Sequence, residues 1–421
     1  MIDKELSMIQ KTTRPLHIAL ISYEYPPDTA DGGIATYVGQ AAQMLQQRGH
    51  QVEVFAGSRE GAGSTVQNGV MAHRVKGVDR HDFADNIGPV FARRHAEQRF
   101  DVLEGPEYHA DAREAVRLVP DIPLIVKLHT PSFMIMEMIY PDLSLSDKIR
   151  TYIGAKRKGK RPFWEYRREE DQEYTHTLQA DEVVSPSTSL GQRMTVDWSL
   201  DAGRVVTIPY PYTPAPALLD ISPDTQTNIV TYIGRLEIRK GVLDLAKAIP
   251  SILERFPHTK FRFVGRSFPS PVKGMTMKDY LSRKLARHAQ AVEFISGVPL
   301  AEIPAVLAGT DVCVFPSLWE NFPNVCLEAM ASARGVVGSS AGGMAEMLDN
   351  GRVGSLVPPR SPEYIVSAVC DLLNNPERRK ELGRAARTRI GEQYHIARIA
   401  ELQEASYQRA IARRRQLGPR S

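Results

Sequence analysis

Short apolar runs alternate with amphipathic helical patterns along most of this chain, and this rhythm constrains the fold more than any other feature. The first run, Leu16 to Ser22, is followed by a loop and then by a helical pattern from Ile34 to Gln47. Similar runs follow at Asp101 to Glu104, Leu124 to His129 and Glu182 to Ser185. Strands and helices in alternation are typical of βα units around a parallel sheet. We therefore expect an α/β protein.

A second series of such runs begins at Ile229 with IVTYIG and continues with FRFVG, VEFISG, DVCVFPS, GVVGSS and GSLVP. Five prolines between Pro209 and Pro223 separate the two series, and such proline density favours an extended linker. Two Rossmann-like domains are therefore expected. The expected segments are a flexible tail at 1–14, an N-terminal domain at 15–208, a linker at 209–228, a C-terminal domain at 229–393 and a helical segment at 394–421.

Composition excludes several classes of protein. The 421 residues contain 53 Lys and Arg against 49 Asp and Glu, and a net charge of +4 does not support nucleic-acid binding. No apolar run approaches the ~18 residues of a membrane-spanning helix, and the first residues lack the apolar core of a signal peptide. The three cysteines form no CxxC unit, which argues against zinc and a disulfide framework. We expect a cytoplasmic protein.

Gly32 and Gly33 lie between the first predicted strand and its helix. Paired glycines let the backbone approach a ligand, and the helix N-terminus behind them presents free N–H groups to an anion. The GxGxxG pattern of dinucleotide sites is absent. A tight turn explains the pair equally well.

The motif GRLEIRKG, Gly234 to Gly241, follows the first strand of the second series. Ligands bind beyond the carboxyl ends of parallel strands, so this loop is well placed for a site. Arg235 offers a fork of donors and Lys240 a point charge, which suits a diphosphate. A charged, solvated loop is the alternative. Cations are unfavourable near a helix N-terminus, so we favour a bound anion.

A second motif, Ser317 to Met330, combines two glutamates with a predicted helix start. Glu320 lies in the loop and Glu328 in the second turn of the helix, where a carboxylate can accept both hydroxyls of a ribose. The free amides of Asn324 and Val325 at the helix start are suited to a phosphate. Two glutamates at this spacing are also common by chance.

The motifs together resemble family 4 of the retaining glycosyltransferases. GRLEIRKG is followed by ENFPNVCLEAM, SSAGGMAEML and GSLVPPRSPE, and the first half contributes SYEYPPDTADGGIATYV, KLHTP and LQADEVVSPS. This resemblance covers nearly the whole chain in the expected order. It implies the GT-B fold, in which two Rossmann-like domains face each other across a cleft. It also implies that the helix at 394–421 returns to the N-terminal domain, which takes the acceptor, while the C-terminal domain takes the nucleotide sugar.

The resemblance implies roles for residues of the second series. Arg235 and Lys240 match the pair that neutralises the departing diphosphate. Glu328 matches the carboxylate on the ribose, and Glu320 matches the one near the sugar hydroxyls. Backbone atoms around Val298 correspond to those that hold the base.

In the first series, Gly33 matches the glycine that lets a loop close on the phosphate and sugar. His129 matches a histidine near the donor sugar and the reaction centre; taken alone, it would be read as a hydrogen-bonded histidine at a strand end. Two positions depart from the family pattern. Asn321 follows Glu320 where the family often has a small residue, and VGRSFPSPVKG, with Arg266, replaces a glycine-rich turn.

The expected activity is retaining transfer of a hexose-type sugar from a nucleotide-diphosphate sugar to a hydroxyl of a sugar, glycolipid or small molecule. A UDP-sugar is expected from the habits of the family. Arg235, Lys240 and a helix N-terminus would stabilise the leaving group, and the sequence has no Asp-x-Asp, so no metal or other cofactor is expected. Two alternatives stay open: a GT-B relative with other chemistry, such as an epimerase or phosphorylase, and a non-catalytic nucleotide-sugar-binding subunit. The oligomeric state is not indicated.

One segment, 132–168, does not belong to these motifs. It combines a stretch rich in Met and Ile with a basic run, Lys156 to Arg161, beside Phe163 and Trp164. Such residues can dock on anionic lipid headgroups, which would place the protein peripherally at the inner face of a membrane. We favour a core-facing helix followed by a solvated loop. A second basic run, Arg409 to Arg415, is expected to be a solvated helix end.

Overall fold

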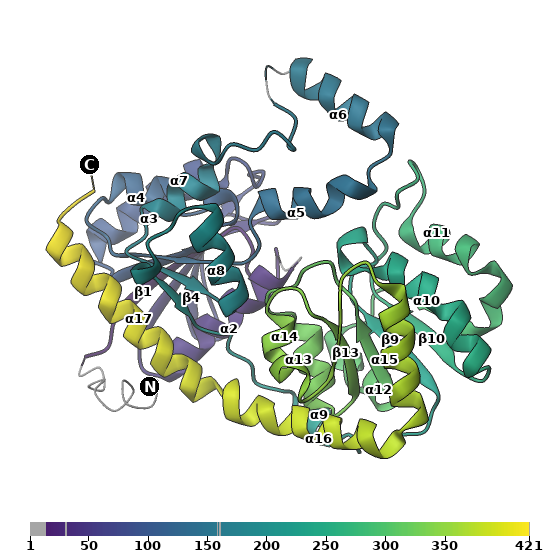
Figure 1. Cartoon of the computed structure of the whole chain (residues 1–421). Helices are drawn as coiled ribbons and strands as arrows, with labels where there is room; N and C mark the ends of the chain where they lie inside the picture. Colours follow the sequence, from purple (N-terminus) through teal and green to yellow (C-terminus); the bar gives the residue numbers. More distant parts are fainter. Residues whose placement is uncertain (1–13, 30–31, 158, 160, 421) are drawn as a thin grey trace. The chain divides into compact units, whose positions relative to one another are not determined.

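A computed structural model of the chain describes residues 14–29, 32–157, 159 and 161–420, and contacts divide it into two compact units (Figure 1). Apart from Arg14, the expected N-terminal tail lies outside the described residues. The first unit comprises the residues up to Ser132, Arg167–Tyr212 and those from Tyr394 onward; the second comprises Phe133–Tyr166 and Thr213–Gln393.

Residues 133–166 belong to the second unit, although the sequence placed them inside a continuous first domain. A long-range contact links this segment to the rest of the second unit. Arg360 donates to both carboxylate oxygens of Asp142, at 2.7 and 3.1 Å, and to the Met138 carbonyl at 3.0 Å. The partners lie more than 200 positions apart, so the local pattern could not reveal them.

An eight-stranded sheet organises the first unit. In spatial order its strands are β3 (Gly63–Gln67), β4 (Val70–Lys76), β2 (Gln51–Ser58), β1 (His17–Ser22), β5 (Val102–Pro106), β6 (Leu124–Lys127), β7 (Glu182–Ser185) and β8 (Val205–Thr207). All neighbours pair in parallel except β3 and β4, which form an antiparallel edge that the sequence did not indicate. Every residue of β1, β6 and β7 is buried, as expected for a parallel sheet covered on both faces.

The helices of the first unit connect or cover these strands. They are α2 (Gly33–Gln47), α3 (Phe83–Glu97), α4 (Arg113–Leu118), α7 (Gln172–Leu178), α8 (Thr188–Asp197) and α17 (Ile396–Leu417), with short 3₁₀ turns at η1 (Tyr108–Ala110), η3 (Arg168–Glu170) and η4 (Ala202–Arg204). Among the described residues, no helix of either unit is both long enough and apolar enough to cross a bilayer.

Helix α17, yellow in Figure 1, packs against the first sheet through buried polar contacts. Gln403 and Tyr407 donate to one oxygen of Glu104 on β5, at 2.9 and 2.8 Å. Arg409 makes a bidentate pair with Glu182 on β7, at 2.7 and 2.8 Å. The helix is therefore joined to two strands of the sheet.

The basic run on α17 is not a solvated helix end, so that expectation was wrong. Arg414 is buried and donates to both oxygens of Asp181, at 2.6 and 3.2 Å. Arg413 donates to the Asp181 carbonyl, and Arg420 to one Asp181 carboxylate oxygen at 2.7 Å. Three arginines thus converge on one aspartate beside β7.

The second unit is built on a six-stranded, fully parallel sheet. In spatial order its strands are β11 (Val292–Ile295), β10 (Lys260–Val264), β9 (Ile229–Ile233), β12 (Val312–Phe315), β13 (Gly335–Ser339) and β14 (Ser355–Val357). Each apolar run of the second predicted series forms one of these strands. The order runs outward from β9 in both directions, which is typical of a doubly wound α/β sheet.

The helices of the second unit include two from the 133–166 segment. They are α5 (Ser132–Ile139), α6 (Leu145–Arg157), α9 (Pro216–Leu219), α10 (Val242–Arg255), α11 (Met277–Lys284), α12 (Ile303–Ala308), α13 (Asn324–Ala331), α14 (Met344–Met347), α15 (Pro362–Asn374) and α16 (Pro376–Gln393). The 3₁₀ turns are η2 (Tyr140–Asp142), η5 (Ile238–Lys240), η6 (Ala286–Ala291), η7 (Leu300–Glu302) and η8 (Asp349–Gly351). Helix α9 lies inside the predicted linker.

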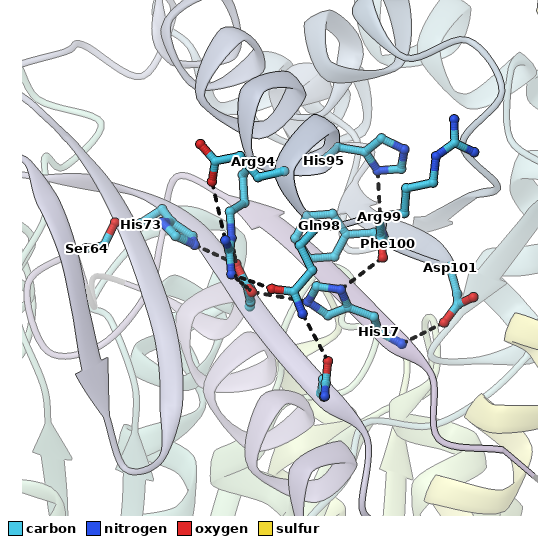
Figure 2. Close-up of polar contacts among 12 residues, drawn as sticks. His17, Ser64, His73, Arg94, His95, Gln98, Arg99, Phe100 and Asp101 are labelled. Carbon is cyan, nitrogen blue, oxygen red and sulfur yellow. Dashed lines mark hydrogen bonds and ion pairs between the residues drawn. The ribbon is translucent and has the colours of Figure 1, made fainter.

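Figure 2 shows a buried polar cluster near the amino ends of β1 and β2 in the first unit. Glu53 on β2 is paired with His17 Nε2 at 3.1 Å and with His73 Nε2 at 2.7 Å. Arg94 on α3 donates to both Glu53 oxygens, at 2.7 and 2.9 Å. Burial alone would raise the Glu53 pKa, but hydrogen bonds from Arg94, His17 and His73 outweigh it and lower the pKa. The carboxylate joins β1, β4 and α3 to β2.

Glu53→Gln is expected to lower the free energy of unfolding by about 2 kcal/mol at pH 7, because the histidines and Arg94 lose their buried carboxylate. A carboxyl whose pKa is depressed in the folded state stabilises the fold above its unfolded pKa and loses this contribution as pH falls. The difference from the unchanged protein should therefore shrink below about pH 4. Urea unfolding at several pH values measures both effects.

The control is Glu97→Gln, which removes an exposed partner of the same Arg94 at 3.4 Å. It should change stability by less than about 0.5 kcal/mol. Equal losses in the two variants would contradict the structural role assigned to the cluster.

Candidate functional site

The carboxyl edge of the second sheet carries the loops of the predicted donor site. Strand β9 leads into residues 234–241 and its parallel neighbour β12 into residues 316–323, so both loops leave from the same edge. Val298 follows β11 at that edge, with β10 between β11 and β9. In the described chain no hydrogen bond joins Val298 to the other two loops. Ligands of doubly wound sheets bind at this kind of edge.

Gly241 brings these two loops into contact. Its φ of 69° is left-handed, and a Cβ there would lie 1.8 Å from the carbonyl oxygen of Pro316. Only glycine fits such a conformation and approach. The Leu318 N–H also donates to the Arg239 carbonyl at 2.8 Å. The charged side chains of one loop are thereby held against the carboxylate of the other.

Lys240 and Glu320 form the central contact of the site. Lys240 Nζ donates to Glu320 Oε1, and Ser317 Oγ donates to the same oxygen at 3.1 Å. Burial lowers the Lys240 pKa, although Glu320 opposes this effect. Burial would raise the Glu320 pKa, but the charges of Lys240 and Arg239 outweigh it and lower the pKa. The structure therefore places a positive and a negative group side by side in a mostly buried position.

Two further cations adjoin this pair. Arg239 NH1 lies 3.9 Å from Glu320 Oε1, and Arg239 NH2 donates to Glu237 at 3.1 Å. Arg235 NH2 lies 3.1 Å from the same Glu237 oxygen, and its guanidinium is 5.4 Å from the Phe268 ring centroid. The Arg235 side chain is 40% exposed, so it remains accessible to a ligand. The predicted pair of cations is therefore part of a group of three.

Helix α13 begins directly after the Glu320 loop. Within the described chain the N–H groups of Asn324 and Val325 have no hydrogen-bond acceptor, as is usual for a helix N-terminus. The buried Oδ1 of Asn324 likewise has no partner there. Glu328 is half-buried, its carboxylate has no ion-pair or hydrogen-bond partner among the described residues, and burial raises its pKa to about 7. The helix thus presents two open amides and a carboxylate able to accept from hydroxyls.

In the first unit, Gly32 is the N-cap of α2 and Gly33 is its first residue. A Cβ on Gly33 would meet nothing within 4 Å, so the space beside it is open. The helix terminus is nevertheless engaged by the protein itself. Glu24 Oε2 accepts from the Ala35 N–H at 3.4 Å, and Arg80 donates to Glu24 Oε1 at 2.5 Å. A phosphate at this terminus would have to share the position with, or displace, that carboxylate.

His129 lies just beyond β6 and is almost fully buried. Its backbone N–H donates to both Glu107 carboxylate oxygens at 2.8 Å, and its ring Nδ1 is 3.0 Å from the Lys127 carbonyl oxygen. A carbonyl oxygen only accepts, so we assign the ring proton to Nδ1. The buried Nε2 has no partner among the described residues and keeps its lone pair. This open acceptor is what distinguishes His129 from a fully satisfied strand-end histidine.

The structure thus joins Lys240 to Glu320 and places the other predicted donor-site residues of the second unit at the same sheet edge. Gly32, Gly33 and His129 belong to the first unit. Sequence reasoning missed Arg239, Ser317 and Phe268. Arg239 stands directly before Lys240 in the charged motif and was a detectable signal. Within the part of the chain that the structure describes, there is no cluster of three or more His, Cys, Asp or Glu side chains suited to a metal ion.

Comparisons with known proteins bear on both units. The model of the "Glycosyl transferase 4-like domain" matches residues 32–211, and that of "Glycosyl transferases group 1" matches residues 227–375. The glycogen synthase of Mycobacterium tuberculosis is 25% identical over 435 residues, which cover 96% of this chain and 97% of the relative. The alpha-maltose-1-phosphate synthase of Mycolicibacterium smegmatis is 30% identical over 57% of this chain and 66% of its own.

Solved structures share the same architecture. Sucrose-phosphate synthase from Thermosynechococcus elongatus superposes with a TM-score of 0.73 at 22% identity, covering 95% of this chain and all of that one. HepE from Anabaena, solved in complex with UDP, superposes with a TM-score of 0.64 at 15% identity, over 93% and 100% of the two chains. These solved glycosyltransferases have the GT-B fold, and the two family models together span most of both units. The chain therefore belongs to the group 1 glycosyltransferases.

Proposed function

We propose that the protein is a retaining glycosyltransferase that moves a hexose-type sugar from a UDP-sugar to a hydroxyl of a sugar, glycolipid or small molecule. The Lys240–Glu320 contact, with Arg235 and Arg239 beside it, is the observation that carries this proposal. Cations held at one sheet edge, next to the open amides of α13, suit a nucleoside diphosphate better than any uncharged ligand. In this proposal the second unit takes the donor and the first unit takes the acceptor.

The chemistry follows from where charge develops. The bond between the anomeric carbon and the diphosphate oxygen breaks, and negative charge accumulates on the leaving diphosphate. Preorganised cations at that position lower the barrier, because they need little reorganisation during the reaction. Glu320 holds Lys240 in place before the donor arrives. A bound diphosphate then gives Lys240 a second anionic partner, and Glu320 is available to accept from sugar hydroxyls.

Retention requires the acceptor hydroxyl to attack from the face that the diphosphate leaves. In this mechanism a diphosphate oxygen takes the acceptor proton as the new bond forms, so no carboxylate nucleophile is needed. We propose a positioning role for His129, whose open Nε2 can accept a hydrogen bond from a sugar hydroxyl.

The choice of a UDP-sugar is supported by relatives of the same fold. HepE of Anabaena was solved with UDP-glucose and a protein of E. coli with UDP-2-fluoro glucose. The direct test is hydrolysis of UDP-, GDP- and ADP-sugars by the purified protein, followed by NMR of the anomeric configuration of the product. Preference for another base would correct the donor, and an inverted product would overturn the retaining mechanism.

Lys240→Ala is expected to lower kcat by about 10³-fold or more, because the leaving diphosphate loses a preorganised charge. Arg235→Ala should act in the same direction. Initial rates at saturating donor measure the loss, and circular dichroism checks that the variants are folded. Lys247→Ala is the matched control, since among the described residues this exposed lysine on α10 pairs only with Asp244, one turn away. Near-normal turnover in either site variant would refute the assignment to the diphosphate.

Glu328→Ala is expected to weaken UDP binding by about tenfold to a hundredfold. A loss of this size corresponds to the free energy that hydrogen bonds to a charged group contribute. Hydroxyls donate to the ionised carboxylate, so binding favours that form. With a Glu328 pKa of about 7 in the free protein, affinity should rise between about pH 6 and 8 and protons should be released on binding.

Calorimetry in buffers of different ionisation enthalpy measures both the affinity and the released protons. Glu293→Ala is the control, because this exposed carboxylate lies toward the amino end of β11, away from the carboxyl edge of the sheet, and pairs with Arg262 at 3.1 Å. Proton release that persists unchanged in Glu328→Ala would show that another group titrates.

Transfer is proposed to need no metal ion, because Arg235, Arg239 and Lys240 supply the positive charge. Pretreatment with EDTA, followed by assay in metal-free buffer, should leave kcat unchanged within about twofold. Loss of activity that Mg²⁺ or Mn²⁺ restores would contradict this part of the proposal.

A further inference from the structure

Helix α6 has no buried residue, so the core-facing helix that we favoured from the sequence is wrong for this part of the segment. Its apolar side chains nevertheless share one face. Leu145, Ile149 and Ile153 recur every four residues and are 73%, 51% and 45% exposed, and Tyr152 on the same face is exposed as well. A surface helix ordinarily turns such a stripe toward the core. Here the stripe points outward.

The other side of α6 is the covered one. Asp147, Lys148, Thr151 and Ala155 are partly buried, whereas every residue of the apolar stripe is exposed. The polar and small residues on this side are therefore the less exposed ones. This orientation leaves the apolar stripe available to something outside the unit.

The charges near the stripe are mostly positive. Residues 145–161 contain seven lysines and arginines and a single acid, Asp147. At 100° per residue, Lys148 flanks one side of the stripe and Arg157 the other, while Asp147 lies opposite. Among the described residues, the α6 cations form one ion pair with a carboxylate, that between Arg150 and Asp147 at 3.0 Å. The cations of α6 itself, within Leu145–Arg157, therefore have little neutralisation from the described residues around them.

Aromatic residues adjoin the helix. Tyr140, Phe163 and Trp164 form a cluster with ring centroids 5.1 to 6.1 Å apart, and all three are half-buried. Lys148 Nζ lies 4.3 Å from the Tyr140 ring centroid and so connects α6 to the cluster. Tyrosine and tryptophan rings with one apolar and one polar side are favoured at membrane–water interfaces.

We propose that the α6 stripe and its flanking cations dock the protein on the surface of an anionic bilayer. The apolar stripe can enter the acyl-chain region of a bilayer, while the cations beside it contact the negative headgroups above that region. A second copy of this chain is a poorer occupant, because it would bring the same excess of cations into contact. This proposal does not depend on the proposed transfer reaction.

The test is flotation of the full chain with vesicles of phosphatidylcholine alone or mixed with phosphatidylglycerol. Binding should require the anionic lipid and should weaken as salt is raised. The double variant Ile149→Gln/Ile153→Gln should reduce the partition coefficient about tenfold or more, and Lys156→Glu/Arg157→Glu should reduce it similarly. The matched control is Val66→Gln/Val196→Gln, which replaces two exposed apolar residues outside the segment and should change nothing.

Three results would overturn the proposal. One is failure of the unchanged protein to float with anionic vesicles at low salt. Another is vesicle binding that is unchanged in Ile149→Gln/Ile153→Gln, because the stripe would then have no part in it. The third is a concentration-dependent dimer, detected by light scattering, that is lost in Ile149→Gln/Ile153→Gln. This result would show that the stripe binds a second copy of the chain. Hydrolysis of a soluble UDP-sugar should be equal in all these variants, so failure of docking is distinguishable from failure of the transferase proposal.

Discussion

The approach of Gly241 to the Pro316 carbonyl is the constraint on which the candidate donor site depends. Parallel pairing of β9 and β12 brings their loops to one edge, but pairing alone would leave room for a side chain between them. The missing Cβ lets the backbones touch, and this contact places Lys240 against Glu320. A buried ion pair is a poor source of stability, because desolvation offsets the attraction. Its value here is positional: a cation is fixed where an anion is to be stabilised.

The two glutamates of the second motif have opposite electrostatic surroundings. Glu320 lies beside Lys240 and Arg239, which lower its pKa despite burial, whereas burial without a cation raises the Glu328 pKa to about 7. Neighbouring carboxylates with separated pKa values are commonly assigned separate tasks. In the proposed site, Glu320 remains charged and orients Lys240 and the sugar. Glu328 gains its charge when ribose hydroxyls bind, so nucleotide binding is coupled to the release of a proton.

The sequence allowed the sheet, its motifs and the residues at the strand ends to be predicted, because these depend on local pattern and on the rule that parallel strands end at one edge. The strand runs and the GRLEIRKG loop are examples. Other features depend on contacts between distant residues. Arg360 assigns the 133–166 segment to the second unit, and Glu24 engages the α2 terminus that glycines had marked as an open anion site. Neither contact has a local signature, so only the folded chain could show them.

Helices α6 and α17 show why the net charge of +4 says little about binding. Both carry basic runs, and the sequence alone suggested a solvated loop for one and a solvated helix end for the other. On α17 the arginines are matched by Asp181 and Glu182, so their charge contributes to the fold. On α6 the cations lie beside an exposed apolar stripe, and among the described residues they pair only with Asp147. What separates the two helices is therefore not composition but the carboxylates that the fold brings to each, and α6, with a single such carboxylate, is the helix suited to an anionic surface.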